Sequence, residues 1–146
     1  MGDLTHTNNG IAALCFPLGA ASVASYAEKA LGDQLNFEVF KYPEELSQAI
    51  IDDPPLVLGL SNYSWNLELA YKLSSWAKQH HPKLIIVFGG PNFPILPQDK
   101  VRFLNSRPVI DFYIENEGEI GFAELLSRLQ EYNFDAEALK RARVTI

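Results

Sequence analysis

The chain has 146 residues, of which 47% are hydrophobic and 21% are charged, with a formal net charge of −6. This composition indicates one globular domain with its own core rather than disorder. Nucleic acids and anionic membranes require a basic face, and the densest cationic stretch is Lys140-Arg141-Ala142-Arg143, so neither is predicted as a partner. The apolar runs are strand-sized and the polar start, Met1–Gly10, lacks a secretory apolar core, so a cytoplasmic protein is predicted.

In chain order, the first expected element is a strand over the apolar run Ile11–Phe16, which contains the one cysteine, Cys15. A free cysteine is most often a buried core thiol, and one cysteine cannot form a disulfide, a structural zinc site or an iron–sulfur cluster. Apolar residues at helical spacing predict a helix over 22–31, ended by Gly32. The alternating segment Phe37–Tyr42 reads as a strand near a sheet edge, and Pro43 opens a short helix.

The second half repeats this alternation of short strands and helices. A strand at Leu56–Leu60 precedes a longer helix from about Asn66 to His80, which Pro82 stops. The most apolar strand, Leu84–Phe88, is expected at the centre of the sheet. A proline-rich loop and a weak helix near 98–105 follow, and then come a fifth strand at Asp111–Ile114 and a core helix marked by Phe122, Leu125, Leu126 and Leu129.

Five strands alternating with helices predict an α/β fold with a five-stranded parallel doubly wound sheet in three α/β/α layers. The expected order is the flavodoxin-like 2-1-3-4-5. Ligands of such sheets bind outside the carboxyl ends of the strands, which selects four loops before any motif is considered. These loops are Pro17–Ser22, Ser61–Asn66, Gly89–Phe93 and Glu115–Glu119.

Several common ligands and activities fit these loops poorly. The loop after the first expected strand has one glycine and one hydroxyl, whereas dinucleotides require several glycines and flavin phosphates require hydroxyl groups. A phosphoacceptor receiver requires an aspartate at the end of the third strand, where Ser61 stands. No nucleophile–base pair for a hydrolase is apparent, and the vicinal histidines His80 and His81 have no third metal ligand in view.

Two strand-end motifs have a different character. The segment Leu58–Asn66 contains a serine after the third strand, and Val87–Asn92 contains Gly89-Gly90 after the fourth. Paired glycines leave a strand end without side-chain bulk, and a hydroxyl such as Ser61 can hydrogen-bond buried polar atoms. The segment Asp111–Glu119, followed by Phe122 and Leu125-Leu126, completes an ordered set of three motifs.

This set resembles the cobalamin (vitamin B12)-binding domain of radical S-adenosylmethionine enzymes over roughly residues 11–132. The resemblance implies a cobalamin-binding domain at 10–132, with 133–146 a linker or the start of a following domain. Cobalamin mutases carry Asp-x-His-x-x-Gly after the first strand, whose histidine ligates cobalt. The loop at Pro17–Ser22 has neither residue, as in many radical S-adenosylmethionine relatives.

The resemblance further implies a module that presents the corrinoid to a radical S-adenosylmethionine catalytic domain, in cis or in trans, often for methyl transfer. That domain would hold the iron–sulfur cluster and S-adenosylmethionine; with one cysteine, this chain is expected to be a fragment or a stand-alone relative that is not catalytic alone. The alternative is a degenerate interaction or regulatory module without cofactor, in which Phe93, Leu18 or Tyr63 plugs the slot.

The candidate cofactor-binding residues come from the four selected loops, and no catalytic or metal-ligating residue is predicted. Tyr63 and Trp65 are equally candidates for stacking on the corrin and for core packing. The acidic residues of the last loop either hydrogen-bond ligand amides or, like Glu119, favour a helix first turn. The candidate set is Leu18, Gly19, Ser61, Asn62, Tyr63, Trp65, Asn66, Gly89, Gly90, Pro91, Asn92, Glu115, Glu117 and Gly118.

Overall fold

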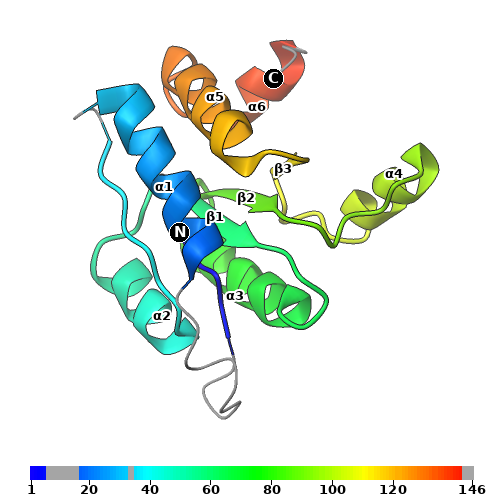
Figure 1. Ribbon diagram of the computed structural model, residues 1–146, viewed down its shortest axis with the longest axis horizontal. Helices are drawn as coiled ribbons and strands as arrows, with labels where there is room; N and C mark the ends of the chain where they lie inside the picture. Colours follow the sequence, from blue (N-terminus) through cyan, green and yellow to red (C-terminus); the bar gives the residue numbers. More distant parts are fainter. Residues whose placement is uncertain (6–16, 33–34, 143–146) are drawn as a thin grey trace.

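The computed structural model describes residues 1–5, 17–32 and 35–142 (Figure 1). The strand predicted at Ile11–Phe16, with Cys15, lies outside the described residues.

The centre of the molecule is a parallel sheet of three strands in the order β1-β2-β3. They are β1 (Val57–Ser61), β2 (Ile85–Gly89) and β3 (Phe112–Ile114). Each lies within one residue of the predicted strand, and β2 is central as predicted from its continuous apolar sequence. The register pairs Gly59 with Val87 and Ser61 with Gly89, so the two strands end at the same edge.

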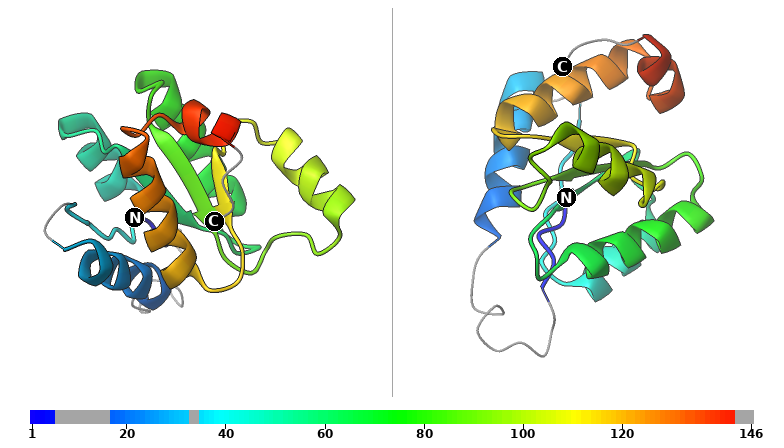
Figure 2. Two further views of the ribbon diagram at one scale, coloured as in Figure 1. Left: turned by 90° about the horizontal axis from the view of Figure 1, so that it is seen from above. Right: turned by 90° about the vertical axis from the view of Figure 1, so that its right-hand side faces the viewer.

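Helices cover both faces of the sheet (Figures 1 and 2). One face packs against α2 and α3, and the other against α1, α5 and α6, while α4 projects to one side. The fold is therefore a parallel α/β fold in layers, as predicted. The helices are α1 (Leu18–Leu31), α2 (Pro43–Asp52), α3 (Leu67–His80), α4 (Pro97–Asn105), α5 (Gly118–Glu131) and α6 (Ala136–Ala142).

The alternation of side chains along the strands divides the core into two clusters. Ile86 and Phe88 pack with the α2 and α3 side, together with Leu58 and Leu60 of β1. Ile85 and Val87 pack with the α1 and α5 side. Because successive strand residues point to opposite faces, Gly59 belongs to the same face as Val87, and this placement shapes the site below.

The edge of the sheet beside β1 is less regular than the sequence predicts. Instead of a strand over Phe37–Tyr42, the structure has a single bridge at Phe40. Gly2 makes isolated parallel bridges with both Phe40 and Leu60, so an extended N-terminal segment lies between them. Only short backbone pairing forms here, since Pro43 begins α2 three residues after Phe40.

Candidate functional site

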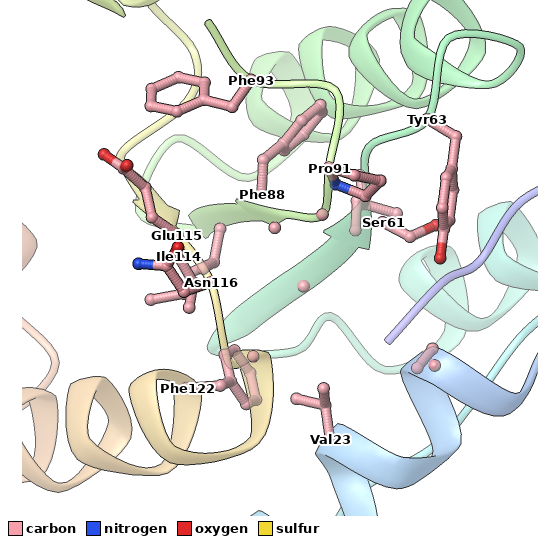
Figure 3. A pocket seen from close by; sticks show the side chains of 18 of the residues that line it. Val23, Ser61, Tyr63, Phe88, Pro91, Phe93, Ile114, Glu115, Asn116 and Phe122 are labelled. Atoms are coloured by element: carbon pink, nitrogen blue, oxygen red, sulfur yellow. The ribbon is translucent and has the colours of Figure 1, made fainter. Parts of the chain in front are cut away.

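A cavity of about 750 Å³ opens at the carboxyl edge of the sheet, where the strand-end loops meet (Figure 3). Residues from α1, β1, β2, the end of β3 and the start of α5 line it. Figure 3 shows Val23 of α1 and Phe122 of α5 on the helix side, facing the strands. The site therefore lies where a doubly wound sheet ordinarily binds ligands.

At the inner end of the cavity, Met1 and Phe122 pack closely over Gly59. A Cβ there would lie 3.3 Å from the Met1 Cε atom and 3.4 Å from the Phe122 Cε2 atom. Gly59 lies two residues inside the carboxyl end of β1, opposite Val87. A larger residue at this central strand position would fill the space between the sheet and the two helices.

Gly90 and Asn62 join the loops that follow β1 and β2. Gly90 has φ +122°, and a Cβ there would lie 2.8 Å from the Asn62 backbone oxygen, so this position requires glycine. The Asn62 backbone N–H donates to the Gly89 carbonyl at 2.6 Å, and its side-chain Nδ2 donates to the Asn92 carbonyl at 2.8 Å. Asn62 is fully buried, so it supports the wall rather than facing the cavity.

Tyr113 of β3 completes this connection. Its hydroxyl donates to the Gly90 carbonyl at 2.8 Å and accepts from Asn62 Nδ2 at 2.9 Å. Burial raises the pKa of Tyr113 to about 12, and the nearby Glu115 carboxylate adds to the increase, against the effect of the Asn62 hydrogen bond. The phenol is therefore protonated at neutral pH and can keep donating to Gly90.

Ser61 has two partners within the protein. Its hydroxyl donates to Asp3 Oδ1 at 2.6 Å and accepts from Asn66 Nδ2 at 3.1 Å. Asn66 is fully buried, and its Oδ1 accepts from the Tyr63 backbone N–H at 2.8 Å. Asn66 therefore holds the loop after β1 in place, and Ser61 lines the cavity with one lone pair left to accept a hydrogen bond.

Charged side chains surround the mouth of the cavity. Lys100 of α4 pairs with Glu115, which follows β3, and its Nζ atom lies 5.7 Å from the centroid of the Phe93 ring. Glu119, in the first turn of α5 as predicted, accepts a 2.8 Å hydrogen bond from Ser22 of α1. These pairs join α4 to the β3–α5 loop and α1 to α5 across the site.

Aromatic residues form two stacks beside the mouth. The rings of Tyr63 and Trp65 are parallel, with centroids 4.6 Å apart, and Trp65 is 63% exposed. Phe93 stacks on Tyr113 with centroids 3.8 Å apart. Leu18 is 70% exposed and does not line the cavity. The slot is therefore open. In a degenerate module, Phe93, Leu18 or Tyr63 would fill it instead.

The structure brings eight of the predicted residues to the cavity wall and leaves six outside it. Those on the wall are Gly19, Ser61, Tyr63, Gly89, Gly90, Pro91, Glu115 and Gly118. Those outside are Leu18, Asn62, Trp65, Asn66, Asn92 and Glu117. Of these six, Asn62, Asn66 and Asn92 support the loops by hydrogen bonds, and Glu117 is the residue before α5.

Sequence reasoning missed the residues of the inner cavity. Val23 and Phe122 read as ordinary core positions of their helices, and Gly59 was part of a motif without a role of its own. The position of Gly59 could have been inferred from the sequence. Residues two apart in a strand face the same side of the sheet, so Gly59 faces the same side as Ser61 at the strand end. Lys100 had no signal, because its position depends on how α4 projects from the sheet.

The donor groups of the site suit an organic ligand better than a metal ion. Neither histidine nor cysteine is among the described residues that line the cavity. In the part of the chain that the structure covers, no three His, Cys, Asp or Glu side chains are grouped to hold a metal ion. His80 lies at the end of α3, where its Nδ1 contacts the Trp76 carbonyl oxygen at 2.8 Å.

No described helix is long and apolar enough to span a bilayer.

The fold and the cavity define a parallel α/β ligand-binding domain with a slot between its sheet and two helices. A family model described as "B12 binding domain" matches residues 8–126. The chain therefore belongs to the B12-binding domain family, as the strand-end motifs predicted.

Curated relatives extend this assignment. The chain is 36% identical over 116 residues to a 2-(S-pantetheinyl)-carbapenam-3-carboxylate methyltransferase of Streptantibioticus cattleyicolor, covering 75% of this chain and 16% of the relative. It is 32% identical over 126 residues to the cobalamin-dependent radical SAM methyltransferase TokK of Streptomyces tokunonensis, covering 80% and 17%. An uncharacterized methyltransferase of Pyrococcus horikoshii is 26% identical, with 79% and 25% covered. The chain thus spans a quarter or less of the length of these relatives.

Proposed function

We propose that this chain binds cobalamin and presents the corrinoid to a radical S-adenosylmethionine catalytic domain, in cis or in trans. The observation that carries the proposal is the open cavity of about 750 Å³ between the sheet and the helices α1 and α5. Ligand pockets commonly enclose about 300–1,000 Å³, so the space suits the nucleotide tail of the cofactor. The cobalt of bound cobalamin supplies the methyl-transfer chemistry, and this chain's residues hold and orient the cofactor.

The residues present fit such a cofactor in three respects. Gly19, Gly59 and Gly89 line the slot without side chains, which suits a flat nucleotide base. Ser61, Glu115 and Asn116 line the cavity with groups that can hydrogen-bond the amides around a corrin ring. The stacked Tyr63–Trp65 pair offers an aromatic surface beside the mouth.

The cavity lining also bears on whether this chain supplies a ligand to cobalt. Because no described residue of the cavity wall is a histidine, we propose that this wall gives cobalt no imidazole ligand. We also propose that the lining residues hold the cofactor for a separate partner domain. These proposals are supported by the family of the chain and by TokK, which is named as a cobalamin-dependent radical SAM methyltransferase.

We propose also that the sheet follows the five-stranded order 2-1-3-4-5. The bridges of Gly2 with Leu60 of β1 and with Phe40 support the order, with the segment at Gly2, rather than the predicted Ile11–Phe16, in the position of the first strand. The carboxyl edge of β1 then borders the strand-order reversal, where ligands of such sheets bind.

The direct test is to add hydroxocobalamin to the purified chain. We expect the visible spectrum of the corrinoid to shift and the corrinoid to co-elute with the protein on gel filtration. An unchanged spectrum together with separate elution, at cobalamin concentrations well above that of the protein, would contradict the proposal.

A variant that fills the slot sharpens this test. In Gly89→Val, the new Cβ would meet the Ile114 carbonyl oxygen at 3.6 Å, an ordinary contact, so the fold should tolerate the change. The side chain would occupy the cavity, and we expect cobalamin affinity to fall about tenfold or more. Lys83→Val is the control, because Lys83 is exposed and lies near the opposite end of β2. Both variants should keep the wild-type circular dichroism; equal binding by Gly89→Val would exclude this cavity as the site.

A further inference from the structure

We propose that α6 is a releasable strap, held against the amino edge of the sheet by an ionic clamp of three side chains. The clamp consists of Asp111, which precedes β3, together with Lys78 of α3 and Lys140 of α6. Release of the strap leaves the rest of the domain folded. The inference does not depend on the proposed function, because the clamp and the slot lie at opposite edges of the sheet.

Asp111 is the centre of the clamp. Its side chain is 8% exposed, and its Oδ2 atom accepts from the Lys78 ammonium and, at 2.9 Å, from the Ile86 backbone N–H. Its Oδ1 atom lies 3.0 Å from Lys140 Nζ. A carboxylate this far from solvent requires charged or hydrogen-bonding partners, because an unpaired buried charge is costly. One side chain therefore joins β2, α3 and α6.

Among the elements that Asp111 joins, α6 has the fewest other contacts to hold it. The helix α3 has 14 residues and buries four of them, Ala70, Leu73, Ser74 and Ala77. Of the seven residues of α6, all of which the structure describes, Leu139 alone is buried. A helix of seven residues is unstable in water by itself. Loss of the clamp should therefore release α6 and leave α3 in place.

The turn between α5 and α6, at the C-terminal end of α5 (Figure 2), favours release. Asn133 has φ +52° and Phe134 has φ +55°, so two consecutive residues with side chains adopt the left-handed region. This conformation is uncommon for a side chain as large as that of Phe134. The turn places α6 against the domain, and the strain that it holds opposes docking. The clamp and the contacts of Leu139 must outweigh this strain.

Release of the strap changes the surface at one edge of the domain. Leu139 belongs to the same core cluster as Leu129 of α5 and Phe112 of β3, and Lys140 Nζ lies 5.6 Å from the centroid of the Phe112 ring. Departure of α6 uncovers these apolar side chains. The residues of α5 that line the slot, Gly118 to Phe122, are at the opposite end of that helix. The strap can therefore open while the slot keeps its walls.

The test is native-state amide hydrogen exchange of the full chain with Asp111→Asn. The amide keeps an oxygen that can accept from the Ile86 N–H, but it removes the charge shared by Lys78 and Lys140. The two ammonium groups then repel one another, and we expect the amides of α6 to exchange about tenfold or more faster. The amides of α3 and α5 should keep their protection.

Glu137→Gln is the matched control for this variant. It also removes one negative charge from a partner of Lys140, but Glu137 is 67% exposed and its ion pair lies within α6. Surface pairs of this kind contribute little, so we expect exchange in α6 to change less than about threefold.

Salt distinguishes an ionic clamp from a loss of packing. Lys140 is 35% exposed, so salt can screen its attraction to Asp111. Raising NaCl from about 0.05 M to about 0.5 M should accelerate exchange in wild-type α6 about twofold or more, relative to α5 amides in the same samples. We expect Asp111→Asn to lose this acceleration. A purely steric effect of the substitution would leave the response to salt unchanged.

A second variant keeps the test decisive if Asp111→Asn fails to fold by circular dichroism. Lys140→Met removes the α6 side of the clamp and leaves the pair of Asp111 with Lys78. It should accelerate exchange in α6, whereas Arg141→Met, at an exposed position of the same helix, should not.

Three results would overturn the inference. They are unchanged protection of α6 in a folded clamp variant, equally faster exchange in α3, α5 and α6, and exchange in wild-type α6 that does not respond to salt. Each of these results leaves the proposed function standing, because none of them measures the slot.

Discussion

At the scale of single residues, one tyrosine bridges the two loops around the slot. Tyr113 donates to the Gly90 carbonyl and accepts from Asn62, whose backbone occupies the space that a Cβ on residue 90 would need. Asn62 also hydrogen-bonds the Gly89 and Asn92 backbones directly, so the Tyr113 hydroxyl adds to an existing connection between the loops. A residue that does not line the slot therefore contributes to its wall.

Tyr113 should titrate far above an exposed tyrosine. We expect ultraviolet difference spectroscopy to find one phenol with a pKa of about 12, and Tyr113→Phe to remove that transition. The unfolded chain loses this proton near pH 10. Since the folded-state pKa is raised, Tyr113 favours folding below that pH, and its contribution is lost as pH rises toward 12. Ionisation of all phenols near pH 10 in the native protein would contradict this account.

At the scale of elements, α6 shows how a short helix becomes part of the domain. It has seven residues, and an isolated helix of that length is unstable in water. Leu139 is 3% exposed, Asp135 Oδ1 caps the Ala138 N–H at 2.9 Å, and Lys140 lies 3.0 Å from Asp111. Burial lowers the pKa of Lys140, but its hydrogen bonds to Glu137 and Asp111 outweigh burial and raise it.

Truncating the buried contact of α6 should release that helix locally. Burial of Leu139 provides its main apolar anchor, and Leu→Ala changes in cores cost about 2–5 kcal/mol. We therefore expect Leu139→Ala to accelerate amide hydrogen exchange across Ala136–Ala142 by more than tenfold while the amides of α5 keep their protection. Arg141→Ala, at an exposed position of the same helix, is the control. Uniformly faster exchange throughout the protein would instead mean that α6 unfolds only together with the whole domain.

At the scale of the whole molecule, the slot is a space between the sheet and two helices at the carboxyl edge of the sheet. The inner wall consists of side chains from α1, α5 and the sheet, which pack against one another elsewhere along their length. A ligand that enters this space gains contacts with three elements at once. It therefore couples binding to the stability of the domain.

Cobalamin should raise the melting temperature of the chain in a concentration-dependent manner. A ligand that binds the folded state alone adds about 2.7 kcal/mol at one hundred times its Kd, which corresponds to a shift of roughly 5 to 10 °C for a domain of this size. Differential scanning calorimetry of wild type and Gly89→Val, with and without cobalamin, measures the effect. We expect the shift in wild type and little shift in Gly89→Val; equal shifts in both would place the ligand elsewhere.

The pattern of the sequence predicts much of this fold because local chemistry and tertiary position agree. The continuous apolar run at β2 demands burial on both faces, and proline and acidic residues at Pro43–Glu45 suit the start of α2. The sheet edge is different. Phe37–Tyr42 alternates as a strand does. Whether it forms a regular strand depends on the length of the segment it pairs with, and the sequence of Phe37–Tyr42 carries no information about that segment.

The candidate site likewise has a part that short motifs predict and a part that only packing determines. A glycine pair, a strand-end serine and an acidic loop mark the mouth, and each can be recognised from residue types within a short motif. The inner wall depends on which side chains α1 and α5 direct at a strand glycine, and Val23 and Phe122 resemble any core residues until the helices are placed. The order of residues thus identified the family and the edge of the sheet where the cavity opens. The size and the apolar depth of the slot came from packing, because they depend on distances between elements far apart in the chain.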